Sequence, residues 1–261
     1  TSTSGCDSFS SMSLENAEIA KISLNTFVTT KITFANMLAD ICERVPGGDV
    51  DVVTKAIGLD TRIGRRYLTG AIGYGGPCFP RDNVALSFIA RELGAEAALA
   101  ETTDRVNRSL TGKITERLRL IIKKGTVVAV LGLAYKPHSH VVEESQGVTL
   151  ANNLAKMGAK VIAYDPLANE SARQELDEGV TVFDSIAECL SESEIVVITT
   201  PDPVFRDLKL HDFVKTKAVL DCWRILDKEL VGNARLQYIP IGRNTSNNTA
   251  LHLSNLWKNF A

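Results

Sequence analysis

The sequence has no apolar run approaching the ~20 residues that a membrane-spanning helix needs. Its first residues also lack the basic and then apolar pattern of a signal peptide. The formal net charge is only -2, which gives no general attraction to nucleic acid or to an anionic membrane. The five cysteines are odd in number and have no CxxC spacing, so neither a disulfide framework nor a zinc site is indicated. These absences predict a cytoplasmic protein with no bound metal and no nucleic-acid or membrane partner.

A G-x-G-x-x-G fingerprint is also missing, so no dinucleotide-binding turn is indicated. The length of 261 residues is nevertheless enough for two domains, each with its own core. The residue pattern predicts a flexible lead over 1–11, a helical domain over 12–122, a sheet domain over 123–243 and a C-terminal tail over 244–261.

The first predicted domain is almost entirely helical. Apolar residues recur at helical spacing over 14–41, 50–57, 83–93 and 99–121. The two long stretches carry more apolar positions than one small domain can bury alone. This excess predicts that the helical domain is a homodimer interface.

Short apolar runs alternate with helical patterns after residue 125. The predicted strands are 126–131, 160–164, 180–183, 195–199, 218–221 and 238–242, and helices are predicted over 149–157, 168–176 and 185–190. Such alternation is typical of a parallel sheet that binds ligands at the carboxyl ends of its strands. The predicted fold is therefore α/β, with a helical central dimerisation domain followed by a Rossmann-like, doubly wound parallel sheet domain.

The most constrained stretch is the loop from Gly73 to Asp82, which has three glycines in its first four positions. Because glycine has no Cβ, the backbone of such a loop can approach a ligand closely. Cys78 lies just before a predicted helix, whose N-terminal partial charge favours a thiolate, and Asp82 falls in the first turn. Taken singly, the cysteine is more typical of a small buried side chain and the aspartate of a helix cap. Together, they favour a reactive site.

This loop resembles the catalytic loop of the UDP-glucose/GDP-mannose dehydrogenases, commonly Gly-Phe/Tyr-Gly-Gly-x-Cys-Phe-x-Lys-Asp, with Arg81 in the place of the lysine. The resemblance implies that Cys78 attacks an aldehyde and forms a thioester, that Asp82 positions or activates water, and that Arg81 faces the cofactor. Lys21 and Asn25 lie four residues apart and on spacing alone favour a solvated polar edge of a helix. Their segment is similar to the family's Glu-x-x-Lys-x-x-x-Asn, which implies that both stabilise the oxyanion.

Further resemblances imply how a nucleotide-sugar would bind. Residues 132–137 are similar to the family's Gly-Leu-Ala-Phe-Lys-Pro, and residues 221–224 to its Asp-x-Arg with one residue more. The implied substrate-binding residues are Tyr67, Leu68, Tyr74, Gly75, Tyr135, Lys136, Arg224 and, from the neighbouring subunit, Arg62. The arginine cluster at 62–66 is also consistent with a solvated surface.

The resemblance covers residues 12–243 but not the N-terminal NAD domain with which family members begin. It implies the central and C-terminal parts of a dehydrogenase that oxidises the CH2OH of a UDP-sugar to a uronic acid with two NAD. NAD would be held mainly by the missing domain, so the chain alone is expected to be inactive. Glu143 stands where many members have an arginine that can contact the dinucleotide. A non-catalytic nucleotide-sugar-binding or dimerisation module and a GDP-mannose dehydrogenase remain alternatives.

Overall fold

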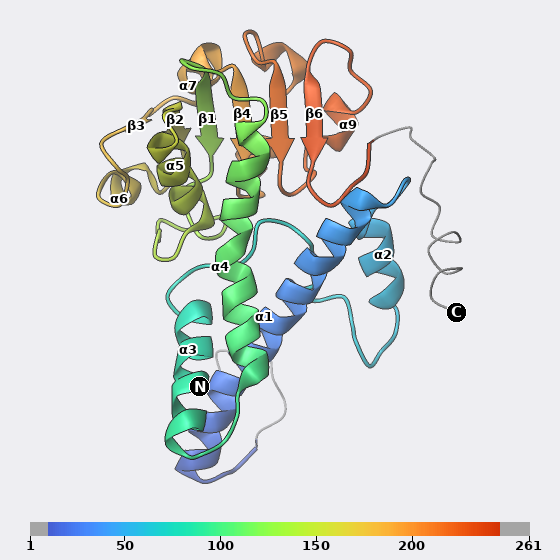
Figure 1. The fold of residues 1–261 in the computed structure, drawn as a ribbon, viewed down its shortest axis with the longest axis vertical. Helices are drawn as coiled ribbons and strands as arrows, with labels where there is room; N and C mark the ends of the chain where they lie inside the picture. The colour runs from blue at the N-terminus through green and yellow to red at the C-terminus, as the bar shows by residue number, and fades with distance from the viewer. Residues whose placement is uncertain (1–9, 246–261) are drawn as a thin grey trace, which may run out of the picture.

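The computed structural model describes residues 10–245, so most of the predicted N-terminal lead and C-terminal tail lies outside the described residues. The helical unit consists of α1 (Leu14–Arg44), α2 (Val50–Ile57), α3 (Phe79–Glu92) and α4 (Ala98–Arg119). Helix α1 begins after Ser13, whose hydroxyl accepts a hydrogen bond from the N–H of Asn16. In Figure 1, α1 and α3 lie below the sheet and the upper part of α4 lies over it, and both α3 and α4 contact α1.

The second unit is a six-stranded parallel sheet in the order β3-β2-β1-β4-β5-β6. Its strands are β1 (Val127–Leu131), β2 (Lys160–Tyr164), β3 (Val180–Val182), β4 (Ile195–Ile198), β5 (Ala218–Asp221) and β6 (Gln237–Pro240). The connecting helices are α5 (Gln146–Lys156), α6 (Asn169–Arg173), α7 (Ile186–Glu192), α8 (Pro203–Arg206), η1 (Leu210–Asp212) and α9 (Asp227–Leu230). The chain order reverses between β1 and β4, which confirms the predicted doubly wound fold. The arrowheads in Figure 1 point toward the helical unit, so the carboxyl ends of the strands face it.

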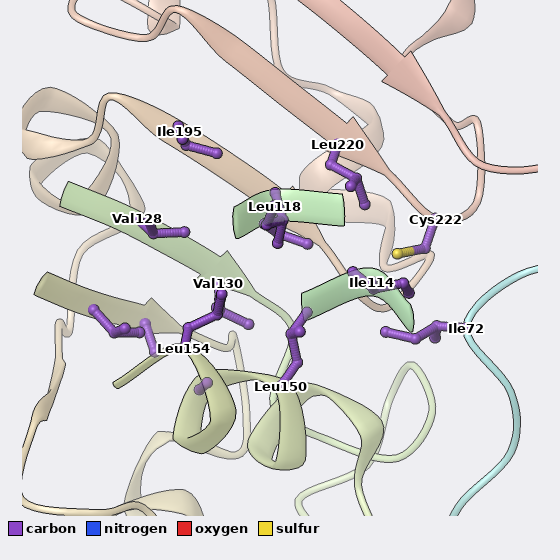
Figure 2. Packing of buried hydrophobic residues seen from close by; sticks show 14 of the residues in the cluster. Ile72, Ile114, Leu118, Val128, Val130, Leu150, Leu154, Ile195, Leu220 and Cys222 are labelled. Atoms are coloured by element: carbon purple, nitrogen blue, oxygen red, sulfur yellow. The ribbon is translucent and has the colours of Figure 1, made fainter. Parts of the chain in front are cut away.

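The sheet is covered on both faces because successive side chains of a strand point in opposite directions. Val128 and Val130 of β1 pack with α5 on one face, whereas Ala129 and Leu131 contribute to a separate buried cluster on the other. The first cluster also contains Leu118 from the C-terminal half of α4, and Figure 2 shows this helix among the side chains of the sheet and α5. Helix α4 therefore joins the two units through a shared core.

Several element boundaries differ from the sequence-based expectation for local reasons. Helix α3 begins at Phe79, not at residue 83, because Pro80 is tolerated in a first turn where its missing N–H costs no bond. Helix α5 begins earlier than expected because the Ser145 hydroxyl caps it by accepting from the N–H of Val148. The short segments α8, η1 and α9 span too few residues to show a helical period. Among residues 10–245, no helix is both long and apolar enough to cross a membrane.

Candidate active site

Helices α1 and α3 bring three predicted site residues into contact. Lys21 and Asn25 lie one turn apart on the face of α1 that meets α3. The ammonium of Lys21 forms an ion pair with Oδ2 of Asp82, and Nδ2 of Asn25 donates to the same oxygen at 2.6 Å. The side chain of Asp82 is 3% exposed and that of Lys21 is 55% exposed. The lysine can therefore be reached from solvent, whereas the carboxylate that orients it cannot.

Two opposing effects set the pKa of Asp82. Burial raises the pKa. The hydrogen bonds from Lys21 and Asn25 and the charges of Lys21 and Arg81 lower it by more than burial raises it. The pKa of this carboxyl consequently lies below its ordinary value. At neutral pH, Asp82 is an ionised acceptor that holds an ammonium and an amide donor side by side.

Cys78 lies beside this group at the N-terminal end of α3. It is the residue that precedes the helix, and its carbonyl oxygen accepts a hydrogen bond from the N–H of Asp82 at 2.9 Å. Arg81 lies between the two functional groups, with Nη2 3.9 Å from the sulfur of Cys78 and Nε 3.5 Å from Oδ1 of Asp82. The thiol thus has a guanidinium and a helix N-terminus nearby.

The other described cysteines have a different environment. Of the four cysteines that the structure describes, Cys42, Cys189 and Cys222 are buried and Cys78 is exposed. Burial raises the pKa of the Cys42 and Cys222 thiols, and it raises that of Cys189 to about 12. These three thiols are therefore inert in the folded protein.

We expect iodoacetamide to label Cys78 at least about tenfold faster than Cys42, Cys189 or Cys222 at neutral pH, because the reagent needs an accessible thiolate. Peptide mass spectrometry across pH measures each site separately. Labelling of the three buried cysteines at the rate of Cys78 would show that exposure does not set this thiol apart.

The glycine loop before Cys78 lies against residues 135–144 of the sheet unit. A Cβ on Gly75 would be 2.2 Å from the carbonyl oxygen of Glu144, and one on Gly76 would be 2.5 Å from the ring of Tyr135. The N–H of Gly76 donates to the carbonyl of Glu143 at 2.9 Å. These glycines are therefore required because the two backbones touch. The loop connects the predicted substrate-binding turn with the thiol.

The structure places the predicted substrate-binding residues in three environments. Arg62, Tyr67 and Lys136 have accessible side chains, and Tyr135 is half-buried beneath the ammonium of Lys136, which lies 5.3 Å from the centre of its ring. Leu68 and Tyr74 are both buried. The Tyr67 backbone has φ 64°, a left-handed conformation that is uncommon for non-glycine residues and recurs at functional sites. Some of the predicted substrate-binding side chains are thus accessible to a ligand, whereas others lie buried beneath the surface.

The Arg224 side chain is only 1% exposed and is engaged within the protein. Its Nε and Nη2 donate to the carboxylate of Asp51 on α2 at 2.7 and 2.9 Å, and Nη1 donates to the carbonyls of Ile241 and Cys222. The guanidinium therefore links the sheet unit to the helical unit. A role in substrate binding would require this bidentate pair to open.

Sequence reasoning missed a buried polar group that extends the α1–α3 contact. Asn83 is fully buried, and its Nδ2 lies 3.0 Å from the hydroxyl of Thr29 and 3.1 Å from that of Tyr74. Thr29 continues the four-residue spacing of Lys21 and Asn25, and this repeat is the signal that could have indicated it. The network fixes α1 and the glycine loop against α3.

Asp165 determines whether the first turn of the sheet can hold a dinucleotide. This buried carboxylate, at the end of β2, accepts hydrogen bonds from the N–H groups of Leu133 and Ala134 at 2.7 and 2.9 Å. Its other oxygen accepts from the N–H groups of Leu167 and Ala168. The amides that a pyrophosphate would need at this turn are thus already bonded within the protein. Residues 132–134 do not fit a dinucleotide pyrophosphate.

A doubly wound sheet whose strand ends face a helical unit with an exposed cysteine, a lysine and a buried carboxylate is typical of an enzyme that acts on a nucleotide-linked substrate. Two domain profiles of one family match the chain: "UDP-glucose/GDP-mannose dehydrogenase family, central domain" over residues 15–109 and "UDP binding domain" over residues 129–228. The chain belongs to the UDP-glucose/GDP-mannose dehydrogenase family.

Individual relatives agree with this assignment. The chain is 35% identical over 235 residues to UDP-glucose 6-dehydrogenase TuaD of Bacillus subtilis, covering 88% of this chain and 51% of that protein. It is 37% identical over 234 residues to UDP-glucose 6-dehydrogenase of Rhizobium meliloti, covering 87% and 53%. A UDP-glucose dehydrogenase structure from Pyrobaculum islandicum superimposes with a TM-score of 0.79 at 34% identity, covering 89% and 52%. The chain thus spans about half the length of the relatives it matches.

Proposed function

We propose that this chain forms the catalytic centre and nucleotide-sugar site of an NAD-dependent nucleotide-sugar 6-dehydrogenase, which oxidises the CH2OH of a UDP-sugar of the glucose or N-acetylhexosamine type to a carboxylate. The observation that carries the proposal is the convergence of Lys21 and Asn25 on Asp82, next to the exposed Cys78. The names of the matched relatives support the same reaction. A dinucleotide-binding domain joined to this chain would complete the enzyme, and that combination is called the complete enzyme below.

The residues of this chain act on the aldehyde stage of the reaction. The Cys78 thiolate adds to the aldehyde carbon and gives a thiohemiacetal oxyanion. Lys21 and Asn25, already held together by Asp82, donate to that oxygen. NAD, held by the other domain, would accept the hydride of each oxidation; loss of the second hydride from the thiohemiacetal carbon would leave the acyl group on Cys78 as a thioester.

Hydrolysis of the resulting thioester returns the thiol. Water attacks the acyl carbon, the carbon–sulfur bond breaks, and the carboxylate product leaves. Asp82 is buried and its pKa is lowered, so it is a weak proton acceptor and would position water through the Lys21 ammonium and the Asn25 amide that it holds. Lys21 is the accessible proton-carrying group of the pair.

The diphosphate of the nucleotide-sugar would bind to Lys136 and to backbone N–H groups of the loop from residue 67 to 75 other than those of Leu68, Ala71 and Tyr74, which donate within the protein. Replacing Lys136 by Ala should weaken UDP-glucose binding by roughly 1.5–3 kcal/mol, the size of a charge-assisted hydrogen bond. Calorimetry with UDP-glucose measures the change. Lys160→Ala is the matched control, because Lys160 is exposed at the amino end of β2, away from the strand ends. Equal affinities of the two variants for UDP-glucose would show that Lys136 does not contribute to binding.

The alternative of a non-catalytic binding module makes a different prediction for the complete enzyme, namely nucleotide-sugar binding without oxidation. Oxidation assays of the complete enzyme with UDP-glucose, UDP-N-acetylhexosamines and GDP-mannose would identify the nucleotide base and the sugar that it accepts. The expectations that the chain alone turns nothing over and that it acts in the cytoplasm stay predictions.

The outer face of α1 supports a homodimer. Five of its exposed apolar side chains are spaced at three, four or seven residues and so form one stripe, consisting of Leu24, Phe27, Phe34, Met37 and Ile41. The stripe lies on the same helix as Lys21 and Asn25, so a second copy would lie near the candidate active site. In such a dimer, Arg62 would reach the partner's substrate, as the family resemblance implies.

Sedimentation at micromolar concentration should show a dimer, and Phe27→Glu combined with Phe34→Glu should make it a monomer, because two carboxylates would be buried in an apolar contact. A matched control is Leu167→Glu, which places a carboxylate at an exposed apolar position on the sheet unit. A wild-type monomer under these conditions would contradict the dimer proposal.

A further inference from the structure

Tyr74 in the glycine loop is held by both structural units through its main chain. Its carbonyl oxygen accepts hydrogen bonds from Nδ2 of Asn107 on α4 and from Nε2 of Gln146 on α5, each at 2.9 Å. Its N–H donates to Oδ1 of Asn107, also at 2.9 Å. One asparagine side chain therefore satisfies both main-chain groups of this buried residue, and a glutamine from the sheet unit binds the same carbonyl.

The surrounding contacts leave the loop little room to move. Asn107 is 3% exposed, and a Cβ on Gly73 would lie 2.5 Å from its Oδ1. On the other side of Tyr74, Gly75 and Gly76 touch residues 135–144 of the sheet unit. The thiol of Cys78 follows two residues later. The loop that carries the thiol is thus fixed by side chains that come from outside it.

We propose that Asn107 and Gln146 are positioning residues for the oxidation, acting through the main chain of Tyr74 to place Cys78 relative to Lys21 and Asp82. The inference rests on the proposed function. The addition of a thiolate to an aldehyde carbon needs both atoms within a fraction of an ångström of the productive geometry. The hydrogen bonds of Asn107 and Gln146 to the Tyr74 main chain are called the clamp below. Because Gln146 belongs to the sheet unit, the clamp links the position of Cys78 to the position of that unit, which carries Tyr135 and Lys136.

Gln146 is the better position to test, because its side chain is not needed for the start of α5. That helix is capped by Ser145, and Gln146 is its first residue. Gln146→Met keeps the length of the side chain and removes the donor to the Tyr74 carbonyl. Asn107→Asp keeps the acceptor for the Tyr74 N–H and removes the other donor. Gln174→Met is the matched control, because Gln174 is an exposed glutamine at the end of α6.

The first measurement is hydrogen exchange of the Gly76 amide, which donates to Glu143. Gln146→Met should speed this exchange about three- to tenfold, the factor that one net hydrogen bond is worth. The second is the steady-state kinetics of the complete enzyme with UDP-glucose and NAD. Gln146→Met should lower kcat about tenfold and leave the KM for UDP-glucose within about twofold. Gln174→Met should change neither quantity.

The outcomes separate the clamp from the proposed function. Unchanged exchange in Gln146→Met would overturn the clamp. Faster exchange with an unchanged kcat would overturn the positioning role, because the contact would then be structural only. If the unmutated complete enzyme oxidises no nucleotide-sugar, the proposed function fails and the positioning role fails with it. If Asn107→Asp does not fold, Gln146→Met decides alone.

Discussion

Replacing Cys78 by Ser should abolish uronic acid formation by the complete enzyme, with a loss of at least ~10³-fold in kcat, the scale seen when a covalent nucleophile is removed. A serine hydroxyl is not ionised near neutral pH, and the nearby carboxylate of Asp82, whose pKa is lowered, is too weak a base to ionise it. Binding of UDP-glucose should stay within about twofold, because the thiol acts on the aldehyde and does not hold the nucleotide.

The control for this variant is Cys42→Ser, which changes a buried cysteine in the last part of α1, close to α2. It should lower stability but leave kcat unchanged below the melting temperature. Product analysis by mass spectrometry measures both variants. If Cys78→Ser forms uronic acid at more than about a tenth of the wild-type rate, the thioester route is wrong.

Lys21→Met should lower kcat by about 10²–10³-fold, the usual cost of removing one donor to a developing oxyanion. The change removes the ammonium from the only described ion pair of α1 that reaches Asp82, while methionine keeps most of the length of the side chain. Lys55→Met on α2 is a matched control, because Lys55 is an exposed lysine away from α3. Equal kcat values for the two variants would mean that Lys21 is only part of a solvated polar edge of the helix and has no role in catalysis.

The same variant makes a prediction about pH. The pKa of Asp82 is lowered in the folded state, so its ion pair with Lys21 stabilises the protein above the unfolded pKa of the carboxyl. This contribution is lost as pH falls through the lower, folded pKa. The stability difference between wild type and Lys21→Met should therefore be constant near neutral pH and shrink in strong acid. Denaturant titrations at several pH values measure it, and a difference that grows on acidification would have the wrong sign.

Local patterns were sufficient to predict most of the fold. Helix 50–57 and the strands 160–164 and 218–221 have the bounds that the sequence indicated, because each is a short apolar segment between clear turn signals. The spacing of Lys21 and Asn25 placed both on one helix face but favoured a solvated edge, so their convergence on Asp82 is seen only in the structure.

The contacts that support the site could not be predicted, because each joins residues far apart in the chain. Gln146 meets Tyr74 across 72 positions, and Arg224 meets Asp51 across 173. No period or motif encodes such a pair. The sequence thus identified Arg224 as a substrate contact, whereas the structure shows its guanidinium bound to α2.

The central claim is that Cys78 carries the sugar as a thioester during oxidation, and rapid quenching of the complete enzyme with UDP-glucose and NAD tests it most directly. Mass spectrometry of the peptide that contains Cys78 measures the covalent state. We expect a nucleotide-sugar uronyl adduct on Cys78 that disappears as product forms and that Lys21→Met accumulates more slowly. Oxidation without any adduct on this peptide, or an adduct on another cysteine, would contradict the account.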